Sequence, residues 1–108
     1  MDTAQRLKTL KFRVEYILQG WPETRNDDVE LTRQLWRVYF PGWIIKHSDG
    51  TEYIALTSLS KIPREDNIKR VRAYWQNTRG LYLPTTWEVA KKRQISETEW
   101  RNAMRANY

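Results

Sequence analysis

Cations and amides gather on one side of the segment IPREDNIKRVRAYWQNTRGLYLPT, which covers residues 62–85. Lysine and arginine can neutralise phosphates, amides can pair with base edges, and a small residue permits close approach to a ligand. A helix over residues 63–77 would place these residue types on its outer face. This face would consist of Lys69, Arg70, Ala73, Gln76 and Asn77, with Arg72 near one border. The pattern predicts a surface that binds nucleic acid.

The opposite side of the same helix is apolar. Ile68, Val71 and Trp75 share it at helical spacing, so we expect these side chains to face the core. A short helix over residues 58–62 would precede Pro63, which suits the first turn of the longer helix. Short helix, turn and longer helix follow the order of a helix-turn-helix, whose second helix enters the major groove of duplex DNA.

The segment LYLP follows Gly80 and favours an edge strand or a wing. From such a wing, Arg79 and Tyr82 would reach the DNA backbone or the minor groove. The helix and the segment after it therefore predict a winged helix-turn-helix arrangement.

The net charge of +6 is distributed unevenly. Residues 1–54 hold eight Lys and Arg against eight Asp and Glu, whereas residues 55–108 hold eleven against five. An ordinary amphipathic helix with a solvated cationic face gives the same helical pattern. The charge excess around the helix, the amides beside its cations and the central Ala73 favour a polyanionic partner.

A second candidate helix-turn-helix lies in TWEVAKKRQISETEWRNAM. Ala90 stands at the packed position of the first helix and Ile95 follows the turn, but Gln94 occupies the turn where the motif favours glycine. Glu97 and Glu99 would also face phosphates at the start of the second helix, so we interpret this segment as a C-terminal helical hairpin. Nonspecific phosphate contacts would come from Lys91, Lys92 and Arg93, for which a solvated helix end is the alternative.

The run SKIPREDNIKRVRAYWQNTRGLYLPT, continuing through WEVAKKR, resembles a group of small bacteriophage and prophage proteins that end in a winged-helix-like segment. The resemblance covers roughly the last half of the chain. It implies a phage context and DNA binding, and it carries no activity that can be assigned residue by residue.

The elements that must position these residues are mainly helical. We expect a single domain over residues 1–108 of mainly α (α+β) class, with five or six short helices and a small β-hairpin or wing. A helical pair would occupy residues 1–42, with helices over residues 3–19 and from Asp27 to before Pro41. Residues 43–108 would hold a hairpin over residues 43–55, with an Asp-Gly turn, followed by the helix-turn-helix-like segment.

Helix starts and core positions can also be predicted. Capping boxes open helices after Asp27, Thr85 and Ser96, the last two over residues 86–93 and 97–106. The predicted core includes Leu10, Val14, Leu35, Ile68, Val71 and Trp75.

Composition limits the class of protein. The chain has no cysteine, which excludes disulfides and thiolate chemistry and suits a reducing compartment. Charges run through the N-terminal segment, so we expect neither a signal peptide nor a membrane span. These features predict a cytoplasmic protein that does not bind a membrane, and the resemblance to phage proteins implies a bacterial host cell.

The residues needed for common catalytic sites are missing. His47 is the sole histidine and lies in a predicted turn, so a catalytic triad or a histidine-rich metal site lacks its parts. The sequence contains no phosphate-binding or dinucleotide-binding glycine motif. We therefore expect no enzymatic activity, no metal and no cofactor.

Two partners stay open. One is duplex DNA, bound for a regulatory purpose. The other is a host defence protein, such as a CRISPR or restriction effector, or its guide RNA, which a phage-encoded inhibitor would bind. Aromatic residues dominate the binding energy of protein interfaces. Those that fall at predicted helix ends or turns are Trp21, Trp43, Tyr82 and Trp87. A homodimer also stays open.

Overall fold

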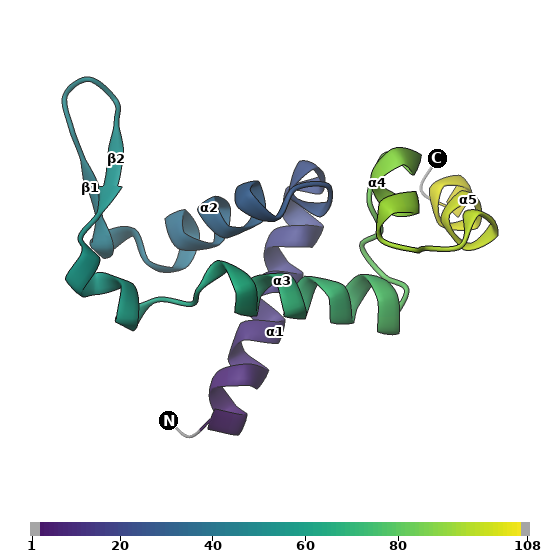
Figure 1. Ribbon diagram of the computed structural model, residues 1–108, viewed down its shortest axis with the longest axis horizontal. Coiled ribbons are helices and arrows are strands. Elements are labelled where there is room, and N and C mark those ends of the chain that lie inside the picture. The colour runs from purple at the N-terminus through teal and green to yellow at the C-terminus, as the bar shows by residue number, and fades with distance from the viewer. Residues whose placement is uncertain (1–2, 107–108) are drawn as a thin grey trace.

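The computed structural model describes residues 3–106, which are mainly helical. Three helices form the body of the protein: α1 (Thr3–Gly20), α2 (Asp28–Tyr39) and α3 (Glu65–Ala73). Each of them packs against the other two, and α1 crosses α3 in Figure 1. Two further helices, α4 (Trp87–Lys92) and α5 (Glu97–Ala106), lie together beyond the C-terminal end of α3.

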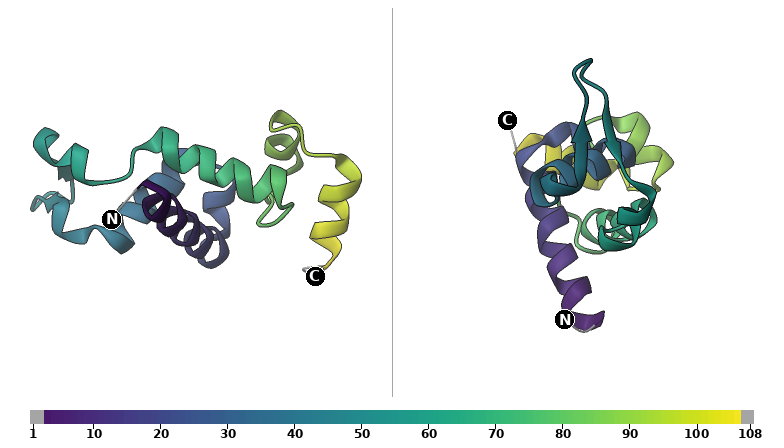
Figure 2. Two further views of the ribbon diagram at one scale, coloured as in Figure 1. Left: turned by 90° about the horizontal axis from the view of Figure 1, so that it is seen from below. Right: turned by 90° about the vertical axis from the view of Figure 1, so that its left-hand side faces the viewer.

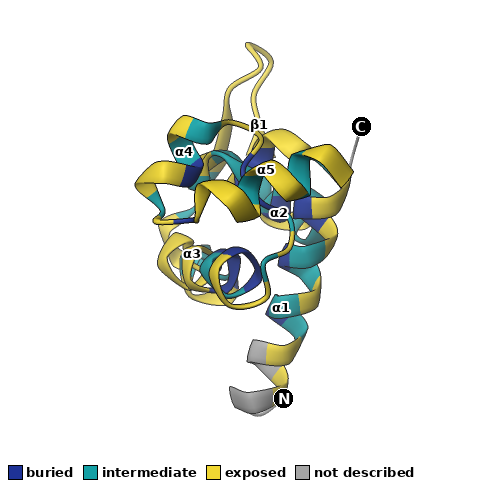
Figure 3. Cartoon of the chain, turned by 90° about the vertical axis from the view of Figure 1, so that its right-hand side faces the viewer, coloured by how far each residue is buried: buried dark blue, intermediate teal, exposed yellow. Residues whose placement is uncertain are grey.

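A β-hairpin projects from the helical body beside α2 (Figures 1 and 2). Strands β1 (Ile44–Lys46) and β2 (Glu52–Ile54) pair antiparallel, with Ile44 opposite Ile54. Gly50 adopts φ 88°, and Asp49 Oδ1 accepts a hydrogen bond from the Thr51 backbone at 2.9 Å. The Asp-Gly turn predicted from the sequence is confirmed, because glycine takes this left-handed backbone conformation without steric cost. Figure 3 shows most of the hairpin as exposed.

Short-range signals place most element ends correctly. Asp27 caps α2, since its Oδ1 accepts from the backbone N–H of Val29 at 2.9 Å. Ser96 Oγ likewise accepts from the Glu99 N–H at 3.0 Å at the start of α5. Three 3₁₀ helices connect the elements of the described chain: Pro22–Arg25, Pro41–Trp43 and Leu56–Lys61. The last of these stands where a short helix over residues 58–62 was expected.

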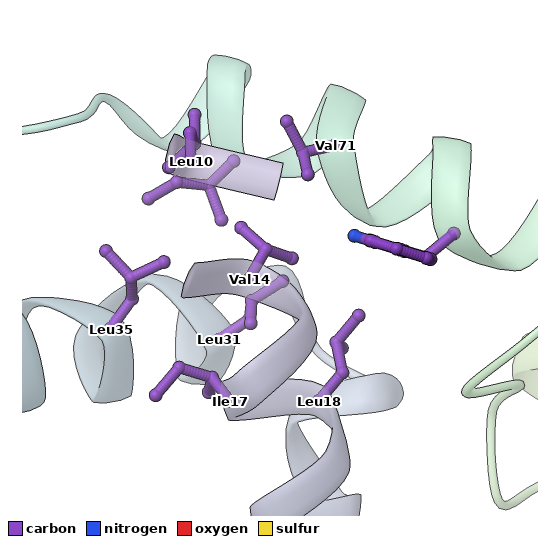
Figure 4. Packing of buried hydrophobic residues seen from close by; sticks show 9 residues of the cluster. Leu10, Val14, Ile17, Leu18, Leu31, Leu35 and Val71 are labelled. Atoms are coloured by element: carbon purple, nitrogen blue, oxygen red, sulfur yellow. The ribbon is translucent and has the colours of Figure 1, made fainter. Parts of the chain in front are cut away.

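The main core lies where α1, α2 and α3 meet, and Figure 4 shows their apolar side chains pointing toward one another. All six predicted core residues belong to it, which confirms the apolar periodicity as the guide to the interior. Its buried members are Leu10, Val14, Ile17, Leu18, Leu31, Leu35, Ile68, Val71 and Trp75.

The last turn of the predicted helix over residues 63–77 is not α-helical. Residues Tyr74–Thr78 form a π-helical turn, in which the Arg79 N–H donates to the Tyr74 carbonyl at 3.0 Å. A π turn holds more residues than an α turn and therefore rotates the side chains that follow. This rotation accounts for a correction: Gln76, predicted on the outer face, is buried together with Trp75.

The segment after Gly80 contains no strand, so the predicted edge strand or wing over LYLP is wrong. Leu83 and Pro84 are buried instead of lying on an exposed edge. The hairpin described above precedes α3 in the chain, whereas the predicted wing would follow it. The coarser class, mainly helical with a small antiparallel sheet, is confirmed.

A second, smaller core joins α4 and α5. Leu83, Ala90 and Ile95 are its buried members. The capping box predicted at Thr85 is wrong, because α4 begins after Thr86 with no side-chain cap. The backbone N–H of Thr85 donates to Asn26 Oδ1 at 2.7 Å, which ties the loop before α4 to the body of the protein.

Candidate nucleic-acid interface

The outer face of α3 carries part of the predicted cationic surface. Lys69 and Arg70 are exposed, and Ala73, the last residue of α3, is half-buried. Figure 3 shows this side of α3 as exposed and the side toward α1 as buried. Asp66 is also exposed and lies one turn before the two cations, so the first turn of α3 adds negative charge to the face.

The structure brings the end of α3 together with the end of α4. Asn77 is exposed, and its Nδ2 donates to the backbone carbonyl of Arg93, the residue that follows α4, at 3.3 Å. Lys91 and Lys92 form the exposed last turn of α4, and exposed Arg79 follows Asn77 by two residues. Arg79, after the π turn that follows α3, and the cations at the end of α4 are thus neighbours in space.

We call the exposed cations of α3, of the residue after the π turn and of the end of α4 the basic patch. Within the part of the chain that the structure describes, none of them forms an ion pair. Their charges are therefore available to a polyanion, because no carboxylate lies within bonding distance. The basic patch consists of Lys69, Arg70, Arg79, Lys91 and Lys92.

Arg72 does not belong to this surface, which corrects its predicted position at the border of the outer face. Its side chain is 6% exposed and pairs with Asp28 of α2, which is 16% exposed. Nε donates to Asp28 Oδ1 at 2.9 Å and Nη2 to Oδ2 at 3.0 Å. Both carboxylate oxygens are used, as in a bidentate guanidinium–carboxylate pair. Arg72 holds α3 against α2 and cannot contact a phosphate in this conformation.

Gln76 is 1% exposed and also serves the interior. Its Nε2 donates to the carbonyls of Arg25 at 3.1 Å and Tyr82 at 2.8 Å, while its Oε1 accepts from Arg93 at 2.9 Å. Every polar atom of this amide therefore has a partner inside the protein. Gln76 cannot pair with a base edge, contrary to the prediction.

Arg93 completes a buried polar network with Asp28, Arg72 and Gln76. Besides Gln76 it donates to the Arg25 carbonyl, and it lies 3.8 Å from Asp28 Oδ1. Burial, and then the charge of Arg72, lower the pKa of Arg93 below its usual value. A guanidinium remains protonated at neutral pH in spite of such a shift. The predicted phosphate contact at Arg93 is therefore replaced by a structural role that fixes α4 to the body.

The turn between α4 and α5 has two local features that the helix-turn-helix pattern requires. Ala90 is buried at 0% exposure, and Gln94 in the turn adopts φ 62°, the conformation for which the motif favours glycine. The start of α5 is acidic, because Glu97 and Glu99 are both exposed there. Arg101 pairs with Glu97 at 2.7 Å. The first turn of α5 therefore disfavours phosphate, and the nearby cations belong to the end of α4.

The predicted aromatic interface is mostly packed. Trp21 is half-buried against the main core, and Trp87 is half-buried with its ring centroid 5.7 Å from that of Trp100. Tyr82 is half-buried, and its hydroxyl donates to Glu15 at 2.6 Å. Burial and this hydrogen bond raise the pKa of Tyr82 to about 12. Of these four residues, Trp43 at the base of the hairpin is the exposed one.

Comparison with known proteins gave no match among protein-family models, curated proteins or solved structures. Over residues 3–106, no helix combines the length and the apolar character needed to cross a membrane. The same residues contain no cluster of histidine and carboxylate side chains that could hold a metal ion.

Proposed function

We propose that this protein binds duplex DNA through its phosphate backbone and that the basic patch is the contact surface. The observation that carries the proposal is the hydrogen bond from Asn77, after α3, to Arg93, after α4, which brings Arg79 near Lys91 and Lys92. Within residues 3–106 these three cations form no ion pair. Phosphate contacts supply essentially all of the affinity in nonspecific DNA binding. The proposed role is regulatory and not catalytic.

Binding would depend little on DNA sequence. Of the two amides predicted to pair with base edges, Gln76 is used inside the protein. Asn77 remains exposed, but its amide nitrogen already contacts Arg93. Contacts to phosphate position a protein on DNA without reading its sequence. We therefore propose that the protein has an architectural or covering role on DNA and does not recognise one operator sequence.

For the finer fold, we propose that α4 and α5, and not α3 with the segment after it, form the helix-turn-helix element. Buried Ala90 and the positive φ of Gln94 support this assignment. The resemblance to small phage proteins adds a phage setting as a further proposal. Inhibition of a host defence protein is placed second, because Trp21, Tyr82 and Trp87 are largely used in packing.

The salt dependence of duplex binding tests this function. Each phosphate neutralised by the protein releases condensed counterion, so five contacts would give a slope of about −4.5 for log K against log salt concentration. We expect two random duplexes of equal length to bind within about threefold of each other. Fluorescence anisotropy of labelled duplexes over a salt series measures both quantities. No binding at low salt, or a flat response to salt, would rule out the proposal.

A further inference from the structure

An open groove of about 260 Å³ separates α2 from the hairpin. All three residues of β2 and Ile44 of β1 line it, and Figure 1 shows β2 as the strand nearer to α2. The lining residues are Arg33, Trp36, Arg37, Ile44, Glu52, Tyr53 and Ile54.

The outer edge of β2 has unpaired backbone groups. Hydrogen-bonded and non-hydrogen-bonded pairs alternate along an antiparallel ladder. Because the His47 N–H donates to the Thr51 carbonyl at 2.9 Å, the pair of Lys46 with Glu52 is of the non-hydrogen-bonded kind. The N–H and C=O of Glu52, and by the same alternation those of Ile54, point away from β1. Within residues 3–106 they have no backbone partner, and such an edge can accept a further strand.

The walls of the groove combine apolar surface with two arginines and one carboxylate, that of Glu52. Ile44 and Ile54 are half-buried, and Trp36 donates its indole N–H to the Pro63 carbonyl at 2.8 Å, which leaves its ring as apolar surface. Arg33 and Arg37 keep 55% and 45% of their side chains exposed. Each pairs with one carboxylate, Glu30 and Glu52 respectively, through a single nitrogen, so further guanidinium N–H groups can bind a ligand.

We propose that β2 and this groove bind an extended, acidic segment of a partner protein, which adds a third strand to the hairpin. Unpaired strand edges bind extended peptides through main-chain hydrogen bonds, while adjacent pockets select alternate side chains. The isoleucines would take apolar side chains of the segment, and Arg33 and Arg37 would take its carboxylates. A second copy of this chain fits less well, because symmetric pairing of the two edges would bring the arginines of both copies together.

This site is separate from the basic patch and does not depend on DNA binding. None of the lining residues belongs to the basic patch, so the two surfaces can be altered independently. Proline on an edge strand removes an outward N–H and is tolerated there. Glu52→Pro blocks the edge that borders the groove, and Lys46→Pro, in the directly opposite residue, blocks the outer edge of β1 in the same way.

The probe is a labelled peptide of about eight residues that alternates glutamate with isoleucine and tyrosine. We expect saturable binding by anisotropy, about tenfold weaker in Glu52→Pro and changed by less than about threefold in Lys46→Pro. Glu52→Gln removes the carboxylate but keeps the outward backbone N–H of residue 52, so this variant should still bind the peptide. The backbone amides of Glu52 and Ile54 should gain protection from hydrogen exchange when the peptide is bound.

Circular dichroism and NMR show whether Glu52→Pro keeps its hairpin. If it does not, a second variant tests the proposal. Arg33→Glu combined with Arg37→Glu should weaken the peptide by at least about tenfold, and a peptide with lysine in place of glutamate should then bind better than the acidic one. The proposal is overturned by no peptide binding, or by equal loss in both proline variants. Two other results would also overturn it. One is that Glu52→Pro or the double arginine variant abolishes binding of single-stranded DNA, and the other is that it abolishes a concentration-dependent dimer seen by sedimentation.

Discussion

Replacing Asp28 with alanine should lower the free energy of unfolding by about 3–5 kcal/mol, because it leaves the Arg72 guanidinium buried without its carboxylate. Both hydrogen bonds from Arg72 end on Asp28, and Arg93 lies nearby with the same sign of charge. Urea unfolding followed by circular dichroism measures the loss.

Asp27→Ala is the matched control, since it removes the same charge one residue earlier. It deletes the α2 cap and should cost about 1 kcal/mol. Asp28→Ala combined with Arg72→Met should recover much of the lost stability, because both partners of the buried pair are then replaced by apolar groups. Equal losses in Asp27→Ala and Asp28→Ala would show that the buried pair does not hold α2 and α3 together.

Gln76→Leu should cost about 2–4 kcal/mol, because leucine matches the volume but leaves the Tyr82 carbonyl and one Arg93 N–H without a partner. The Arg25 carbonyl loses one of its two donors. The same variant should bind duplex DNA normally once conditions keep it folded. Thermal and urea unfolding measure the first effect, and anisotropy with random duplex measures the second.

Asn77→Leu is its control, since the neighbouring amide is exposed and makes one hydrogen bond of 3.3 Å. Its stability should change by less than about 1 kcal/mol. If Gln76→Leu proves neutral for stability but weakens one DNA sequence selectively, Gln76 reads bases after all and the buried polar network is of minor importance.

The helices and the main core could be predicted because their determinants are local. Apolar spacing placed Leu35, Val71 and Trp75 inside, and Asp27 marked the start of α2 through a hydrogen bond two residues along the chain. The Asp49-Gly50 pair likewise fixed the hairpin turn, since its requirement for a left-handed backbone is set within the turn itself.

The inward direction of Arg72 and Gln76 could not be predicted from local pattern. Arg72 pairs with Asp28, which lies 44 residues away in the sequence. In the sequence alone, Asp28 indicates only a favourable negative charge in the first turn of a helix. Gln76 turns inward because of the π turn, which α-helical spacing cannot represent. Buried polar contacts therefore removed Arg72, Gln76 and Arg93 from the predicted interface, and tertiary contact placed the predicted cations at the end of α4 near Arg79.

The segment after α3 shows the same limit. LYLP has the composition of a strand, but a strand is stable only when it pairs with another strand. Local composition does not show whether such a partner strand is present. Leu83 instead packs with Ala90 and Ile95 in the second core. This packing places α4, and with it Lys91 and Lys92, beside the end of α3.

Duplex affinity of matched double variants tests the proposed interface most directly. Lys91→Ala with Lys92→Ala removes two charges from the basic patch, and Arg33→Ala with Arg37→Ala removes two from the groove beside the hairpin. The first pair should weaken random duplex by about tenfold or more at low salt and reduce the salt slope by about 2, while the second should change affinity by less than about threefold. Equal losses in both pairs would mean that net charge alone governs binding, and an unchanged affinity in the first pair would contradict the basic patch as the DNA contact.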